Sequence, residues 1–202
     1  VRDFFEQCCG PNGDVPHHNF DKAMPWPFAE EDYIDVVTGR VAREQLSRHP
    51  AEKPFYMKVS FCGPHKPYDA PQRYLDMFPL EQEDDFLLPE GQVIAQKDKE
   101  ALWRQRRSSK AMIKLIDDQI GEILRLLEKR GMMEDTLVLF TSDHGDMLGD
   151  HYLLQKGVPW RQAVNVPLAI RLPGAEPTGE NPYPVELSDL AATILDYAGL
   201  DA

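Results

Sequence analysis

Three short apolar runs along the chain have the composition of β-strands buried in a sheet. They cover residues 55–61, 136–140 and 166–172, and polar or turn-forming residues follow each of them. Apolar runs of this length, rich in aromatic and β-branched residues, are typical of strands covered on both faces. Pro167, in the third run, is tolerated at a first strand position or on an edge strand.

Between these runs, apolar positions recur with the spacing of amphipathic helices. The patterns cover residues 30–49, 98–130 and 186–198. Ile34, Val37, Val41 and Leu46 are the apolar positions of the first, and Gly131 follows the second as a C-terminal cap. The stripe of the second pattern consists of Met112, Ile116, Ile120, Ile123 and Leu127. Strands separated by helices predict an α/β fold, a mostly parallel sheet with helices on both faces.

Residues 1–30 are rich in loop-forming residue types, whereas residues 31–202 carry the α/β pattern. The 202 residues, 42% of them apolar, are enough for one domain with a core. No apolar run reaches about 18 residues, the length that a membrane span requires. Cys8, Cys9 and Cys62 are too few for a disulfide framework and form no zinc-binding spacing.

The net charge of −12 argues against nucleic-acid binding, which requires a basic surface. It is compatible with a cation site, and equally with solubility alone. One basic cluster interrupts the acidic composition, and we predict that it is a solvated helix face rather than an anion site. It consists of Arg104, Arg106, Arg107 and Lys110.

The sequence turns polar directly after the second apolar run. Acid, hydroxyl and imidazole groups follow within ten positions, separated by Gly145 and Gly149: Ser142, Asp143, His144, Asp146, Asp150 and His151. Open α/β sheets place their ligands at the carboxyl ends of strands. This stretch is therefore the first candidate for a functional site, although Asp143 and His144 could instead simply cap the following turn.

His65 is a second candidate, because it follows the first apolar run and lies between Pro64 and Pro67. Proline fixes the backbone on either side, so the imidazole has a preset direction. The alternative is a turn histidine that is hydrogen-bonded to the backbone.

Together these residues have the chemistry for breaking a sulfate or phosphate ester. Asp143 and a neutral His144 can ligate a divalent cation. Lys156 can neutralise the charge on a tetrahedral oxyanion, and His65 can donate a proton to the leaving oxygen. Electrostatic stabilisation would be the larger contribution, by several kcal/mol.

The order of the motifs resembles the sulfatase domain of the alkaline phosphatase superfamily over about residues 32–200. The matching stretches are residues 59–61 with 63–68, 115–121, 142–151 with Lys156, 166–168 and 189–195. By this resemblance, Asp143 and His144 would be metal ligands and Lys156 would bind the sulfate oxygens. His65 would protonate the leaving group, and His151 is similar to a residue that lines the substrate pocket.

The chain also departs from the family pattern. Sulfatases carry, near their amino end, a pair of adjacent metal-binding acids and a Cys-or-Ser-x-Pro-x-Arg motif whose first residue becomes the formylglycine nucleophile. Neither occurs here, since the sequences after Cys9 and Cys62 lack the arginine. We therefore expect one partial catalytic domain, without its amino-terminal half and carboxyl-terminal subdomain, that binds metal weakly and is inactive alone.

For the whole protein, the resemblance implies a sulfuric ester hydrolase acting on a small-molecule or carbohydrate sulfate ester. The metal would be Ca²⁺, with Mn²⁺ or Zn²⁺ as alternatives because imidazole at position 144 suits them. A phosphodiesterase or phosphonate monoester hydrolase of the same superfamily is the nearest alternative function, and a non-catalytic relative is the next. Family members are commonly exported, which favours an exported or periplasmic location.

Overall fold

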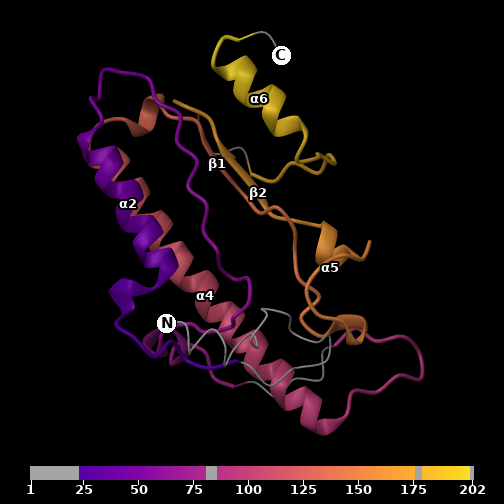
Figure 1. Ribbon diagram of the computed structural model, residues 1–202. Coiled ribbons are helices and arrows are strands. Elements are labelled where there is room, and N and C mark those ends of the chain that lie inside the picture. The colour runs from indigo at the N-terminus through magenta and orange to yellow at the C-terminus, as the bar shows by residue number, and fades with distance from the viewer. Residues whose placement is uncertain (1–22, 81–85, 176–178, 201–202) are drawn as a thin grey trace.

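The longest amphipathic pattern forms the longest helix, α4 (Gln96–Lys129), along which most of the structure is arranged (Figure 1). The computed structural model describes residues 23–80, 86–175 and 179–200. The predicted apolar stripe of α4 is buried or half-buried, and Gly131 adopts the left-handed conformation at its end, as expected. Within the described ranges, no helix is both long and apolar enough to cross a membrane.

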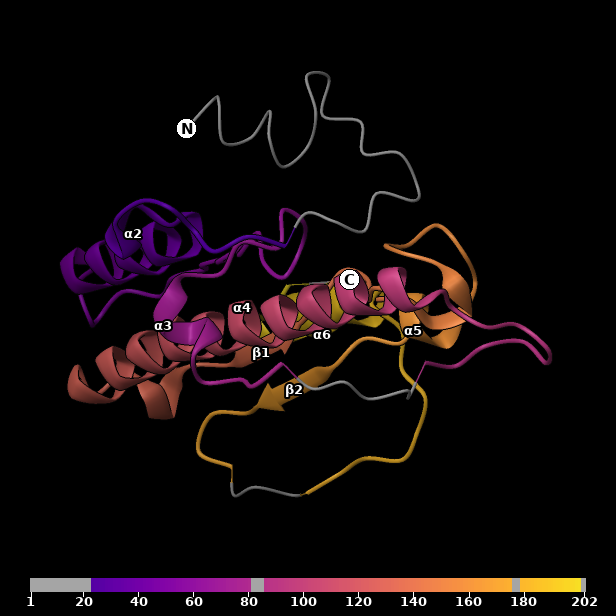
Figure 2. The same ribbon diagram turned by 90° about the horizontal axis from the view of Figure 1, so that it is seen from below.

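The other elements are short. In chain order they are the 3-10 turn η1 (Glu30–Asp32), α2 (Ile34–Arg48), α3 (Gln72–Leu75), α4, η2 (Met133–Asp135), β1 (Val138–Thr141), η3 (Asp150–Tyr152), α5 (Arg161–Val164), β2 (Leu168–Arg171) and α6 (Asp189–Tyr197). Helices α2 and α4 lie side by side, as Figures 1 and 2 both show. The loop-rich start is described only from Ala23, so most of that prediction, with Cys8 and Cys9, lies outside the described residues.

Helix α2 buries only part of the predicted apolar set, because Leu46 is buried and Val37 half-buried while the other two predicted positions are not. Ile34 and Val41 are exposed, whereas Asp35 is fully buried and accepts hydrogen bonds from the backbone N–H groups of Cys62 (2.7 Å) and Gly63 (2.9 Å). The prediction was wrong here because hydropathy ranks isoleucine above aspartate, while two buried donors require an acceptor. The carboxylate thus holds the turn that precedes His65.

The main core lies between α2, α3 and α4. It contains three tyrosines together with small and aliphatic residues: Tyr33, Tyr68, Ala70, Tyr74, Leu75, Ala111, Met112 and Leu115. A second cluster around Leu46 and Leu127 joins the other ends of α2 and α4, and Phe55, Met57 and Val138 pack against it. These contacts place residues 55–57 next to both the helical layer and β1.

The α/β class is confirmed, but the sheet differs from the one predicted. Among the described residues, the named strands β1 and β2 form a two-stranded antiparallel sheet in which Val138 pairs with Arg171 and Thr141 with Leu168. A parallel pair needs a crossover connection, usually a helix, that returns the chain to the same end of the sheet. The connection between β1 and β2 contains only the short helical turns η3 and α5, and β2 runs back antiparallel to β1.

The apolar run at residues 55–61 is extended but pairs with no strand in the described part of the chain. Its side chains alternate, with Phe55, Met57, Val59 and Phe61 half-buried and the residues between them exposed. Period-2 burial is the geometry of a strand that covers one face. The predicted extended conformation of this run is thus confirmed, whereas the predicted burial of both its faces is wrong.

The basic cluster on α4 is not a uniformly solvated face, contrary to the prediction. Arg106 forms an ion pair with Asp150 (2.8 Å) and donates to the carbonyl of Leu148 (2.9 Å). Arg107 donates to the carbonyls of Leu75 (2.8 Å) and Phe78 (2.7 Å). Guanidinium groups carry several donors in a fixed fork, which suits them to fastening loops onto a helix.

Asp69 makes the stability of the fold dependent on pH. Burial raises the pKa of this carboxyl to about 6. The hydrogen bond from the Tyr33 hydroxyl (3.1 Å) lowers the pKa, but by less than burial raises it. Because the folded-state pKa lies above the unfolded value, the stabilising contribution is complete below about pH 3.8 and is lost as the pH rises through about 6. The shift corresponds to about 3 kcal/mol.

Asp69→Asn keeps an acceptor for Tyr33 and removes the buried charge. We expect its unfolding free energy, relative to the wild type, to rise by about 3 kcal/mol between pH 4 and pH 7. Chemical denaturation of the whole protein across this range measures the difference. The exposed Glu128→Gln on α4 is the matched control and should show no such trend. A pH-independent difference for Asp69→Asn would contradict the assignment.

Candidate active site

The candidate site begins where β1 ends. After Thr141 the chain leaves the sheet, and the Ser142 hydroxyl donates to the carbonyl of His144 (2.8 Å). One carboxylate oxygen of Asp143 accepts the N–H of His144 (3.0 Å). These local bonds, one of which uses Oδ1 of Asp143, fix the backbone of the Asp143–His144 pair.

Asp143 and His144 point two potential metal-binding atoms towards each other. Nδ1 of His144 is hydrogen-bonded to the carbonyl of Gly145 (2.8 Å), so it carries the proton, and Nε2 keeps the lone pair. This Nε2 lies 3.6 Å from Oδ2 of Asp143. Donors that each lie about 2.2 Å from one cation can be separated by such a distance.

This pair supplies only two of the donors that a metal site requires. The described part of the chain has no group of three or more histidine, cysteine, aspartate or glutamate side chains that could hold an ion. Asp143 is 85% exposed in its side chain, so it is accessible to further ligands. A full coordination shell would need donors in addition to this pair.

A pocket of about 400 Å³ opens beside the pair and brings Lys156 to it. The lining residues come from both sides of the loop: Asp143, His144, Lys156, Gly157, Val158, Ala163 and Val164. No ion pair of Lys156 occurs among the described residues, and the side chain is exposed. The pocket thus combines a carboxylate, an imidazole and a free ammonium group, a combination that can hold an anion next to a cation.

Gly145 brings the loop after β1 into direct backbone contact with α5. Its N–H donates to the carbonyl of Ala163 (2.8 Å), and a Cβ at this position would overlap the carbonyl oxygen of Gln162. Only glycine permits this approach. The Asp143–His144 pair and α5 are therefore held at a fixed separation.

Asp150 anchors the far side of the loop. This largely buried carboxylate accepts bonds from the Leu87 N–H (3.1 Å), from Arg106 of α4 (2.8 Å) and from Gln162 of α5 (2.8 Å). Three satisfied acceptor bonds, one of them charged, compensate the desolvation of the carboxylate. Asp150 therefore connects the loop to α4 and α5 and has no free oxygen facing the pocket.

His151 is placed differently from the other predicted site residues. Its ring stacks on Trp160 with the centroids 4.0 Å apart and an interplanar angle of 11°, and it is not among the residues that line the pocket around Lys156. Its backbone is left-handed, with φ 54°, and its buried Nδ1 has no partner among the described residues. Trp160, which sequence reasoning did not select, is 46% exposed.

His65 is exposed, and within the described part of the chain it makes no hydrogen bond or ion pair with the Asp143–His144 pair or Lys156. Its Nδ1 is hydrogen-bonded to the carbonyl of Lys66 (2.8 Å), which leaves Nε2 as the atom for proton exchange. The bond to the backbone is the one that the alternative of a turn histidine predicted. The nearest connection to the pocket runs through Tyr68, whose hydroxyl donates to Asp146 (3.2 Å).

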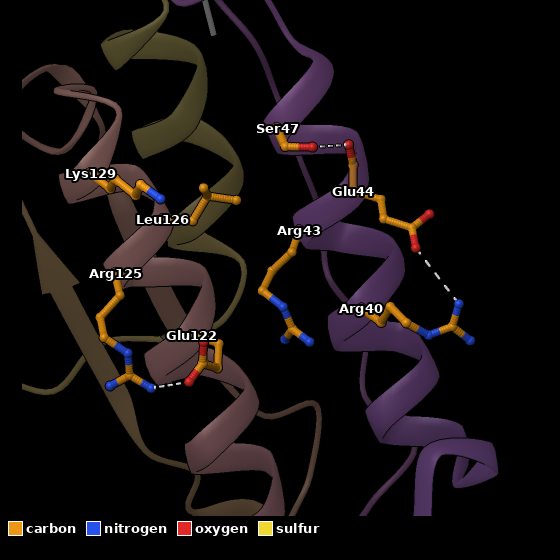
Figure 3. A pocket seen from close by; sticks show the side chains of 8 residues that line it. All are labelled: Arg40, Arg43, Glu44, Ser47, Glu122, Arg125, Leu126 and Lys129. Carbon is orange, nitrogen blue, oxygen red and sulfur yellow. Dashed lines mark hydrogen bonds and ion pairs between the residues drawn. The ribbon is translucent and has the colours of Figure 1, made fainter.

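A second groove, of about 440 Å³, lies between α2 and α4 (Figure 3). It contains none of the predicted site residues, and its charges are partly paired, Arg40 with Glu44 and Arg125 with Glu122. In the close view Arg43 extends between the two helices, where it donates to Gln119 (2.9 Å). The groove therefore has the charge pattern of an ordinary helix–helix surface.

The arrangement of elements matches solved structures of the alkaline phosphatase superfamily. A phosphonate monoester hydrolase from Silicibacter pomeroyi superposes with a TM-score of 0.75 at 23% identity, over 98% of this chain and 46% of that chain. A protein solved with its substrate, D-glucosamine-2-N,6-O-disulfate, superposes with a TM-score of 0.70 at 20% identity, over 83% of this chain and 49% of that one. These likenesses establish the fold.

Sequence comparison establishes the family. The sulfatase family model matches residues 5–200. An arylsulfatase of Clostridium perfringens is 34% identical over 194 residues, 87% of this chain and 40% of that protein. A choline-sulfatase of Rhizobium meliloti is 33% identical over 180 residues, 77% and 34% respectively. The chain belongs to the sulfatase family and spans about two fifths of the length of these relatives or less.

Proposed function

We propose that the protein containing this chain hydrolyses sulfate esters, with a divalent metal and a formylglycine nucleophile that lies outside this sequence. The observation that carries the proposal is the single pocket shared by Asp143, His144 and Lys156. Membership of the sulfatase family supports it. The chain supplies the two metal-binding donors, the ammonium group and the acid, while the nucleophile must come from elsewhere.

Asp143 and His144 would hold the metal through Oδ2 and Nε2, the two atoms that face each other. The bound cation would neutralise charge on the sulfate oxygens and on the nucleophile. Ca²⁺ is the ion that we propose, with Mn²⁺ or Zn²⁺ as alternatives because of the imidazole ligand. The carbonyl of Gly145 orients the His144 ring, which would leave Nε2 available as a ligand for the ion.

Lys156 would bind the sulfate oxygens, because its ammonium group is exposed in the same pocket and unpaired in the described part of the chain. As the S–O bond to the alcohol breaks, negative charge grows on the leaving oxygen. His65, protonated on Nε2, would donate the proton that this oxygen needs. His151, which stacks on Trp160 and does not line this pocket, would contact the substrate beyond it.

The substrate would be a small-molecule or carbohydrate sulfate ester. The relatives named above as arylsulfatase and choline-sulfatase, and the structural neighbour with a disulfated glucosamine, support this class. Phosphonate monoester or phosphodiester hydrolysis is the second candidate, favoured by the imidazole at position 144 and by the fold of the phosphonate hydrolase. We further propose an exported or periplasmic location, as is common in the family.

The test uses the whole protein as its source produces it, with nitrophenyl sulfate and a nitrophenyl phosphonate ester as paired substrates. We expect kcat/KM for the sulfate to exceed that for the phosphonate by at least about tenfold. A chelator should abolish the activity, and added metal should restore it. A preference for the phosphonate would support the second candidate, and inactivity on both esters would refute the proposal.

A further inference from the structure

One carboxylate joins the two segments that carry the proposed acid and the proposed sulfate-binding lysine. Asp146 follows the Asp143–His144–Gly145 turn and is half-buried. Its Oδ1 accepts the N–H groups of Leu148 (3.0 Å) and Gln155 (2.9 Å), and its Oδ2 accepts the hydroxyl of Tyr68 (3.2 Å). Asp146 belongs to the polar stretch after β1 but has no catalytic or metal-binding role in the proposed function.

On one side, Asp146 fixes the residue that precedes Lys156. The N–H of Gln155 is held by Asp146, and its carbonyl accepts the N–H of Met147 (2.9 Å). Gln155 has φ 64°, a left-handed backbone conformation that a residue other than glycine keeps when its surroundings hold it there. The bonds to Asp146 and Met147 provide that enforcement, so they set the point from which Lys156 extends.

On the other side, Asp146 reaches the segment of His65 through Tyr68. Tyr68 is 5% exposed within the main core, and its backbone carbonyl also accepts the N–H of Met24 (3.2 Å). Only two residues separate it from His65, and one of them is Pro67, whose φ is fixed. The short, proline-restricted connection limits how far His65 can move relative to Tyr68.

We propose that the Tyr68–Asp146 hydrogen bond is a positioning contact that sets the distance between His65 and Lys156 in catalysis. The proposal rests on the proposed function, because it assigns no chemistry to either residue. Tyr68 and Asp146 act through the acid and the lysine, and neither needs to touch the substrate. General-acid catalysis depends steeply on alignment with the leaving oxygen, so a small displacement of His65 should be measurable.

The test is Tyr68→Phe in the whole protein, which removes one hydroxyl and keeps the ring in the core. Tyr74→Phe is the matched control. Tyr74 lies in the same core cluster, is fully buried and also donates to an aspartate, Asp118 (3.1 Å), but has no bond to the loop after β1. Each variant is measured on an activated aryl sulfate and on an alkyl sulfate, whose poorer leaving group needs the proton more.

We expect Tyr68→Phe to lower kcat on the alkyl sulfate about tenfold and on the aryl sulfate less than about twofold, with KM unchanged. Tyr74→Phe should leave the ratio of the two rates at the wild-type value. An unchanged ratio in Tyr68→Phe, or equal changes in both variants, would overturn the positioning role while the wild type stays active. Inactivity of the wild type on sulfate and phosphonate esters would refute the proposed function and the positioning role with it.

Discussion

Replacing Lys156 with alanine in the whole protein is expected to reduce kcat/KM for sulfate esters about a thousandfold. The ammonium group lines the same pocket as Asp143 and His144 and has no ion pair in the part of the chain described, so its charge is free to act on the bound sulfate. A charge that is already in position stabilises the transition state without reorganisation, whereas the water that replaces it in the variant must reorient and stabilises it less. Steady-state kinetics on an aryl sulfate measures the effect.

Lys129→Ala is the control for the loss of one positive charge. Lys129 is also exposed, but it lies on α4 in the groove between α2 and α4. Its substitution should leave kcat/KM within about twofold of the wild type, since screened surface charges act weakly over distance. Equal turnover in the wild type and Lys156→Ala would remove Lys156 from the mechanism.

Gly145→Ala is expected to destabilise the whole protein by about 3 kcal/mol or more and to abolish activity. The added methyl group overlaps the carbonyl oxygen of Gln162, which belongs to the backbone and cannot rotate away. The two segments must separate, and the hydrogen bond from position 145 to Ala163 is lost with the contact. Thermal and chemical denaturation measure the stability, and ester hydrolysis measures the site.

Gly121→Ala is the matched substitution. Gly121 lies inside α4, and the atoms nearest to a new Cβ belong to the flexible side chain of Arg125, 3.4 Å away. Alanine should therefore be tolerated there and can stabilise the helix by up to about 1 kcal/mol. If Gly145→Ala unfolded like Gly121→Ala, the close contact with Gln162 would not be a constraint in solution.

The local part of the site could be predicted from sequence, and the non-local part could not. Asp143 and His144 belong to a polar run at a strand end, and the sulfatase resemblance added Lys156, so a shared site could be proposed before the structure placed all three in one pocket. Tyr68 and Asp146 are 78 positions apart, and their bond depends on how two loops meet in space. The stacking of Trp160 on His151, nine positions away, was not predicted either, because it depends on the irregular backbone of the loop between them.

The fold was predictable to a similar extent. Helix α4 and its cap followed from a long regular pattern, because burial of one stripe dominates the energetics of such a helix. The buried face of α2 could not be predicted in full from its own pattern. Asp35 is buried because it accepts hydrogen bonds from the N–H groups of Cys62 and Gly63, which lie in another segment. The direction of β2 depended on how the chain returns after the site loop, which local composition does not encode.

The extended segment 55–61 also affects the tendency of the chain to associate with other chains. Its backbone donors and acceptors have no ladder partner in the described ranges, and one face of it is apolar. A segment of that kind is a template for edge-to-edge association with another chain. Lys58 is the charged residue within it that opposes such pairing. The tendency of a fragment that contains residues 55–61 to aggregate would therefore depend on these seven residues more than on the net charge of −12.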